Sequence, residues 1–107
     1  MNILITGSNG FIGSNIIKFL SNNVNYKLFK GNRNTIDLYS LDNIERYIDE
    51  NQIDTVIHCA IDGGNRLEHD TYEMFYKNIL MYENLIKFNH RYKMFINFGS
   101  GAEYDRK

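Results

Sequence analysis

The chain has 107 residues, a formal net charge of −1 and 43% hydrophobic residues, which leaves room for one domain with a modest core. The balanced charge excludes the basic footprint of a nucleic-acid-binding protein, and no apolar run is long enough to cross a bilayer. A strand-like segment follows Met1 directly, without the pattern of a secretion signal, and the single cysteine, Cys59, cannot form an internal disulfide. We therefore expect a cytoplasmic protein that binds neither nucleic acid nor a membrane.

Strand and helix patterns alternate along the chain. Short apolar runs predict strands at 2–6, 26–30, 54–60 and 93–98, with a further brief strand at 35–38. Apolar residues at three- and four-residue spacing predict helices at 10–22, 41–51 and 70–90. This alternation predicts an α/β fold, a Rossmann-like parallel sheet in a three-layer α/β/α arrangement with right-handed crossovers.

The helices carry further signals. Ser40 stands in the N-cap position of helix 41–51. Two helices are expected to have broad apolar faces. In helix 10–22 that face comprises Phe11, Ile12, Ile16, Ile17, Phe19 and Leu20. In helix 70–90 it comprises Tyr72, Phe75, Ile79, Tyr82, Leu85, Ile86 and Phe88.

Three glycines at three-residue spacing, Gly7, Gly10 and Gly13, lie between the first strand and the first helix. Such a turn lets the backbone approach a pyrophosphate while the positive end of the helix points at it. Ligands of parallel α/β sheets bind at the carboxyl ends of the strands, so the segments 31–33, 59–64 and 98–101 are expected at the same edge. We predict a nucleotide site there, although 62–64 taken alone is better explained as a tight turn.

The glycine spacing, with Thr6 before it and Phe11-Ile12 inside it, resembles the extended short-chain dehydrogenase/reductase (NAD-dependent epimerase/dehydratase) family. Further matches follow in the family's order: Asp37-Leu38 as the adenine-contacting pair, His58-Cys59-Ala60 beside the phosphates and ribose, Asn78 in the long helix, and Phe98-Gly99-Ser100. Within the family the chain looks closest to GDP-fucose synthases. The short stretches that carry this similarity are also shared with dTDP-4-dehydrorhamnose reductases and sugar 4-epimerases.

The resemblance implies hydride transfer between a nicotinamide cofactor and a keto group of a sugar nucleotide, with Ser100 as a catalytic residue. It also implies a homodimer that pairs through helix 70–90. The candidate cofactor-binding residues are Gly7, Ser8, Asn9, Gly10, Phe11, Ile12, Gly13, Arg33, Asp37, Leu38, Cys59, Ala60, Ile61, Asn78, Phe98 and Gly99.

The end of the second strand bears on the choice between NAD and NADP. An acidic residue there would bind the ribose hydroxyls of NAD, but none occurs from Lys30 to Asn34, whereas Arg33 could pair with a 2′-phosphate. NADP(H) is therefore the favoured cofactor. The alternative, that Arg33 is a solvated loop residue, stays open.

Other reactive groups have simpler interpretations. Cys59 lies in an apolar strand, which favours a packed residue or a cofactor neighbour over a nucleophile. His58 is expected to be a hydrogen-bonded residue of a buried strand. His58, His69 and His90 have no metal-ligand spacing, so no metal site is predicted.

The acid/base pair of the family, a tyrosine followed four residues later by a lysine, has no match. Tyr104 and Lys107 are three residues apart and lie in the turn after the last strand. We expect residues 1–107 to be the N-terminal part of a dinucleotide-binding domain, without a substrate domain and without meaningful turnover alone. The alternative is a non-catalytic nucleotide-binding or interaction module.

Overall fold

A parallel sheet with the strand order β2-β1-β3-β4 forms the centre of the protein. It is seen in a computed structural model that describes residues 1–61 and 72–98. The strands are β1 (Asn2–Thr6), β2 (Lys27–Gly31), β3 (Thr55–His58) and β4 (Met94–Asn97). The helices are α1 (Phe11–Leu20), α2 (Leu41–Asn51), α3 (Tyr72–Ile86) and the short 3-10 helix η1 (Asn89–Arg91).

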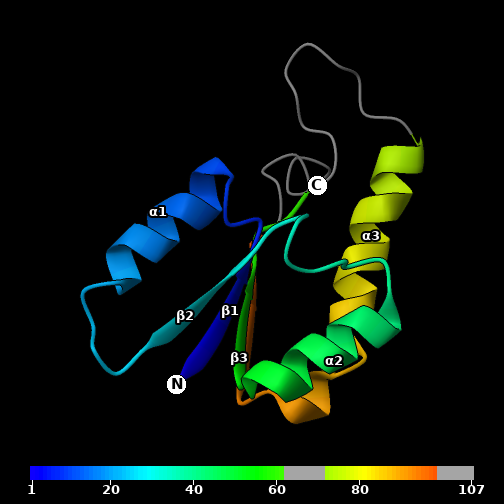
Figure 1. Ribbon diagram of the computed structural model, residues 1–107. Helices are drawn as coiled ribbons and strands as arrows, with labels where there is room; N and C mark the ends of the chain where they lie inside the picture. The colour runs from blue at the N-terminus through cyan, green and yellow to red at the C-terminus, as the bar shows by residue number, and fades with distance from the viewer. Residues whose placement is uncertain (62–71, 99–107) are drawn as a thin grey trace.

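Helix α1 covers one face of the sheet, and α2 and α3 lie on the other (Figure 1). The predicted three-layer α/β/α arrangement with a parallel sheet is therefore confirmed. Within the described residues no helix has both the length and the hydrophobicity needed to cross a bilayer.

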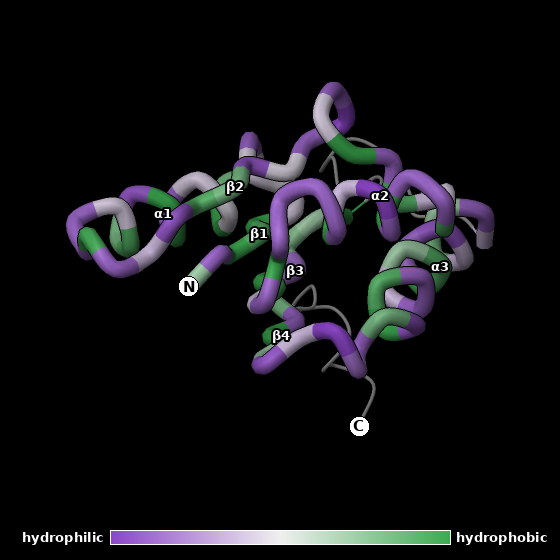
Figure 2. Tube along the Cα trace, turned by 60° about the horizontal axis from the view of Figure 1, so that its bottom comes forward, coloured by the Kyte–Doolittle hydropathy of each residue, from purple (hydrophilic) through white to green (hydrophobic). Residues whose placement is uncertain are grey.

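Strand β1 is central and supplies both halves of the core. Ile3 and Ile5 point to the α1 side, where they pack with Ile57, whereas Leu4 points to the α2 and α3 side and packs with Val56 and its neighbours. This division follows from the two-residue period of a strand. Figure 2 shows hydrophobic residues concentrated on β1 and along α3. Parallel strands covered on both faces are expected to be apolar in this way.

The predicted apolar faces of the helices are only partly correct. In α1, Ile16, Ile17 and Leu20 pack on the sheet, but Phe11 and Phe19 are 84% and 81% exposed. One α-helix turns a single stripe toward a sheet, so six apolar residues spread over a wider arc cannot all reach it.

Helix α3 shows the same limit. Its buried residues are Met81, Asn84 and Leu85, at three- and four-residue spacing. Of the residues predicted for the apolar face, Leu85 is buried, but Tyr72, Phe75, Ile79 and Tyr82 are exposed. The helix ends at Ile86, and the following residues form η1 rather than continuing to residue 90.

The predicted strand at 35–38 is wrong. Ile36 and Leu38 are buried, which produced the alternating pattern, but the backbone forms a turn. The N–H groups of Thr35 and Ile36 both donate to the carbonyl of Asn32, at 3.0 Å. The segment is thus a loop whose two apolar side chains anchor it to the core. The predicted N-cap is confirmed, because the hydroxyl of Ser40 accepts a hydrogen bond from the Asn43 N–H.

Candidate functional site

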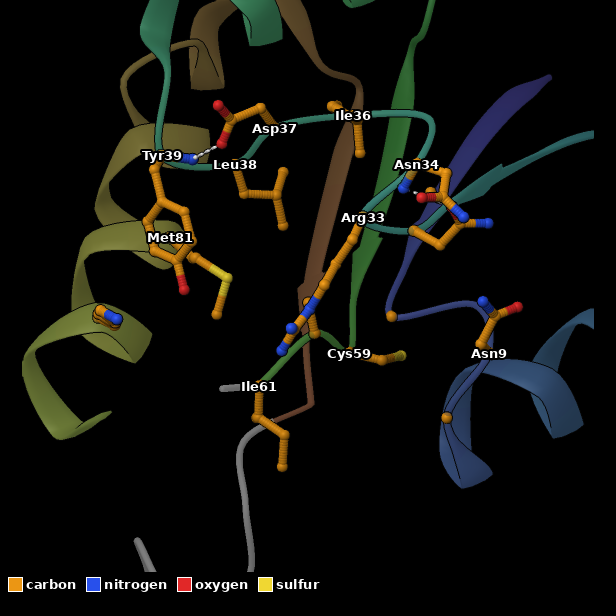
Figure 3. Close-up of a pocket in the computed structure, with 16 residues that line it drawn as sticks. Asn9, Arg33, Asn34, Ile36, Asp37, Leu38, Tyr39, Cys59, Ile61 and Met81 are labelled. Carbon is orange, nitrogen blue, oxygen red and sulfur yellow. Dashed lines mark hydrogen bonds between the residues drawn. The ribbon is translucent and has the colours of Figure 1, made fainter. Parts of the chain in front are cut away.

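A cavity of about 830 Å³ opens where the strands end. This volume is in the range of small-molecule sites. Five segments form its wall: the turn after β1, the exit of β2, the loop before α2, the residues after β3, and α3 (Figure 3). The carboxyl edge of the sheet, where the sequence predicts a nucleotide, is therefore hollow.

The cavity brings together many of the predicted residues. Those that line it are Gly7, Asn9, Gly10, Arg33, Asp37, Leu38, Cys59, Ala60 and Ile61. Six other predicted residues that the structure describes do not line it: Ser8, Phe11, Ile12, Gly13, Asn78 and Phe98. Gly99 and the catalytic candidate Ser100 lie outside the described residues, as do Tyr104 and Lys107.

The three glycines of the turn have different roles. Gly7 has a φ of +66°, and a Cβ there would lie 2.7 Å from the backbone nitrogen of Ala60. A Cβ on Gly13 would lie 2.2 Å from the carbonyl oxygen of Gly7. Gly10, the N-cap of α1, has an ordinary φ of −80°, and its Cβ would meet only the Gly7 oxygen, at 3.4 Å. Gly7 and Gly13 thus allow the turn to close, and Gly10 keeps the cavity wall open beside the start of α1.

Ser8 is buried and does not line the cavity. Its N–H donates to the Gly31 carbonyl at 3.1 Å, which joins the turn to the end of β2. Its hydroxyl oxygen is buried and has no hydrogen-bond partner within residues 1–61 and 72–98. Ser8 therefore helps to shape the turn and does not contribute to the cavity wall.

A buried hydrogen-bond network joins the ends of β1 and β3 directly beneath the cavity. The Thr6 hydroxyl accepts hydrogen bonds from the N–H groups of Cys59 and Ala60, at 3.0 and 3.1 Å. Its own hydrogen must then point to the Nδ1 of His58, 2.7 Å away. His58 is consequently neutral with its proton on Nε2, and it is the hydrogen-bonded residue of a buried strand that the sequence predicts.

Burial lowers the pKa of His58 to about 4. In the unfolded chain the pKa is near 6.5, so between these values the unfolded state binds more protons and stability falls as the pH is lowered. We expect a loss of about 3 kcal/mol from pH 7 to pH 4, measured as the free energy of unfolding in urea. The His58→Gln variant should be less stable at pH 7 and show a flatter profile from pH 6.5 to 4. An equally steep profile in that variant would contradict this role of His58.

Cys59 is half-buried, packs beside Ile3, Ile5 and Ile57, and also lines the cavity. Burial raises the pKa of its thiol to about 11, so the thiol is protonated at neutral pH. A protonated thiol is a poor nucleophile. The position is compatible with both predicted alternatives, a packed residue and a cofactor neighbour, and not with a nucleophile.

The sequence predicts a cofactor contact from helix α3 at Asn78, but the helix lines the cavity with two other residues. Lys77 and Met81 line the cavity one helical turn apart, and Tyr39 does so from the loop before α2. The Lys77 ammonium lies 3.3 Å from the Glu73 carboxylate. The i, i+4 spacing of this ion pair is visible in the sequence, but the packing of α3 against the strand ends is not.

The charges of the cavity favour an anion. Arg33 extends from the exit of β2 across the cavity toward the residues that follow β3 (Figure 3). Lys77 is a second cation in the wall, and Asp37 is the one acidic residue among the described residues that line it. The amino end of α1 adds a partial positive charge beside Gly10. Elsewhere in the described part of the chain, no group of three or more histidine, cysteine or acidic residues is arranged to hold a metal.

A parallel α/β sheet with a glycine turn, a helix amino end and a cationic cavity at its carboxyl edge defines a Rossmann-like nucleotide-binding domain. The sequence model of the NAD dependent epimerase/dehydratase family matches residues 3–107. The chain belongs to this family. No curated protein matches the sequence.

Solved structures share the fold. GDP-mannoheptose C4 reductase from Campylobacter jejuni, with NADP bound, matches with a TM-score of 0.82 and 24% identity, over 96% of this chain and 34% of that one. A GDP-L-fucose synthetase from Naegleria fowleri, bound to NADP, gives a TM-score of 0.75 and 21% identity, over 90% and 29%. A dTDP-4-dehydrorhamnose reductase from Clostridium acetobutylicum gives 0.73 and 25%, over 88% and 34%. The chain thus spans about a third of the length of these proteins.

Proposed function

We propose that residues 1–107 form the amino-terminal, cofactor-binding part of a nucleotide-sugar reductase or epimerase. The cavity at the strand ends carries this proposal, since the glycine turn, Arg33, Asp37 and the residues after β3 all line it. The family membership of the chain and the NADP held by two structures of the same fold support it.

In this proposal the pyrophosphate lies against Gly10 and the amino end of α1, where backbone N–H groups and the helix dipole favour negative charge. The adenosine half extends past Ile61 toward Asp37 and Leu38. Asp37 then accepts a hydrogen bond from the amino group of adenine. Asn78 and Phe98, which do not line the cavity, stay candidates for contact with the nicotinamide half.

NADP(H) is the proposed cofactor, with Arg33 paired to its 2′-phosphate. A guanidinium pairs bidentately with phosphate, and the loss of such a charged hydrogen bond costs about 2 kcal/mol, or roughly 30-fold in affinity. We therefore expect Arg33→Ala to weaken NADPH binding about 30-fold and NADH binding less than about twofold.

The measurement is a titration of each dinucleotide followed by nicotinamide fluorescence. Lys30→Ala is the matched control, because Lys30 lies on β2 and does not line the cavity. Equal affinities for NADPH and NADH that Arg33→Ala leaves unchanged would refute the NADP preference. Arg33 would then be a loop residue with no part in binding.

The reaction proposed for the whole protein is hydride transfer between nicotinamide and a sugar-nucleotide keto group, with Ser100 as a catalytic residue. A GDP-linked sugar is the favoured substrate, on the resemblance to GDP-fucose synthase, and dTDP-linked sugars are the alternative. The exposed apolar residues Phe75, Ile79 and Tyr82 on α3 support a homodimer that pairs through this helix.

A further inference from the structure

Asn84 is a polar residue inside an apolar core. It lies on α3 with only 4% of its surface exposed, between Met81 and Leu85, which both belong to the core cluster on that side of the sheet. A buried amide requires a hydrogen-bond partner. The Nδ2 of Asn84 donates to the carbonyl oxygen of Leu38, 3.0 Å away and 46 positions earlier in the chain.

The bond reaches a loop that lines the cavity. Two further hydrogen bonds of this loop are local: Asp37 N–H donates to Asn43 Oδ1 at 2.7 Å, and Ser40 N–H donates to the Asp37 carbonyl at 3.2 Å. Local bonds fix the shape of the loop but not its position against α3. The Leu38 side chain packs in the core, where contacts are not directional. The Asn84 bond is therefore a directional link between this loop and α3.

The hydrogen bond to Leu38 also affects the orientation of Asp37. The Leu38 carbonyl and the Tyr39 N–H belong to one planar peptide group, so fixing the first orients the second. The Tyr39 N–H donates to Oδ1 of Asp37 at 3.0 Å, as Figure 3 shows. The other carboxylate oxygen of Asp37 accepts no hydrogen bond from residues 1–61 or 72–98. A buried amide on α3 thus aims a carboxylate in the cavity wall.

We propose that Asn84 is a positioning residue that sets the base preference of the nucleotide site. This inference rests on the proposed function, in which Asp37 meets the base. A carboxylate accepts a hydrogen bond from the amino group of adenine but repels the oxygen that hypoxanthine carries in its place. Asn84 keeps a carboxylate oxygen of Asp37 in the position where it accepts a hydrogen bond from adenine and repels the hypoxanthine oxygen.

The test compares NADPH with its reduced hypoxanthine analogue, both titrated by nicotinamide fluorescence. Asn84→Leu keeps the volume and removes the donor, and Asn84→Ala serves as a second variant with less crowding. We expect both to weaken NADPH binding about tenfold and the analogue less than about twofold. Leu85→Val is the matched control. It alters a neighbouring residue of the same core cluster and keeps the Asn84 amide that bonds to Leu38, so it should change both affinities equally.

A second measurement needs no ligand. Hydrogen exchange of the Tyr39 amide should accelerate in the Asn84 variants more than that of Ile44, whose N–H bonds to the Ser40 carbonyl at the start of α2. Equal weakening of both dinucleotides, or Tyr39 exchange that changes no more than that of Ile44, would overturn the inference. A parent chain that binds neither dinucleotide would overturn the proposed function and the base preference with it. The exchange result then shows separately whether Asn84 holds the loop.

Discussion

Gly13→Ala is expected to lower the free energy of unfolding by about 3 kcal/mol. The new Cβ would lie 2.2 Å from the Gly7 oxygen and 2.9 Å from the Gly7 carbonyl carbon, both of which are backbone atoms that cannot rotate away. Alanine favours a helix over glycine by about 1 kcal/mol, which is too little to offset this overlap. Urea unfolding measures the difference.

The control is Gly10→Ala in the same turn. Its Cβ would meet the Gly7 oxygen at 3.4 Å, close to ordinary contact, so the change in stability should stay below about 1 kcal/mol. If both alanine variants are as stable as the parent chain, the turn does not close as tightly as the Gly13 contacts require. If both lose stability equally, the division of roles between Gly10 and Gly13 is wrong.

Gly10→Val is expected to weaken NADPH binding by at least about 100-fold while leaving the fold intact. The φ of −80° at Gly10 suits any L residue, so valine can be accommodated in the backbone. Its branched side chain would stand in the cavity wall where the pyrophosphate must approach the amino end of α1. Binding is followed by nicotinamide fluorescence, and folding by circular dichroism.

Ser14→Val introduces the same side chain one turn later on α1, at an exposed position outside the cavity wall. This control should bind NADPH like the parent chain. A Gly10→Val variant that binds equally well would show that the pyrophosphate does not lie at this turn.

The sequence predicts the sheet and the main features of the cavity well because both depend on local patterns. The apolar runs of β1 and β3 mark buried parallel strands, and the glycine turn and Arg33 follow strand ends. Once the strands are parallel, the topology itself places these loops at one edge. No knowledge of long-range packing is required for this step.

Packing decides the features that were missed or mistaken. Ile36 and Leu38 alternate like strand residues, yet the turn at Asn32 takes up the backbone hydrogen bonds of that segment. The exposure of Phe11 likewise depends on which stripe of α1 meets the sheet, and its hydrophobicity alone does not indicate this.

The positions of Lys77 and Asn84 on α3 are a further feature that packing decides. Lys77 and Asn84 resemble ordinary polar residues of an amphipathic helix in the sequence. Only the docking of α3 against the loop before α2 places Lys77 in the cavity wall and Asn84 beneath the Leu38 carbonyl. Such contacts between residues more than 35 positions apart leave no local pattern in a single sequence.

The most direct test of the account is a titration of the isotope-labelled chain with NADPH, followed by amide chemical shifts in two-dimensional NMR. We predict saturable shifts at the turn after β1, the exit of β2, the loop before α2 and the residues after β3. The amides around Phe19 and Val24, at the far end of α1, should not move. Absence of saturable shifts, or shifts confined to the far end of α1, would contradict a dinucleotide site at the strand ends.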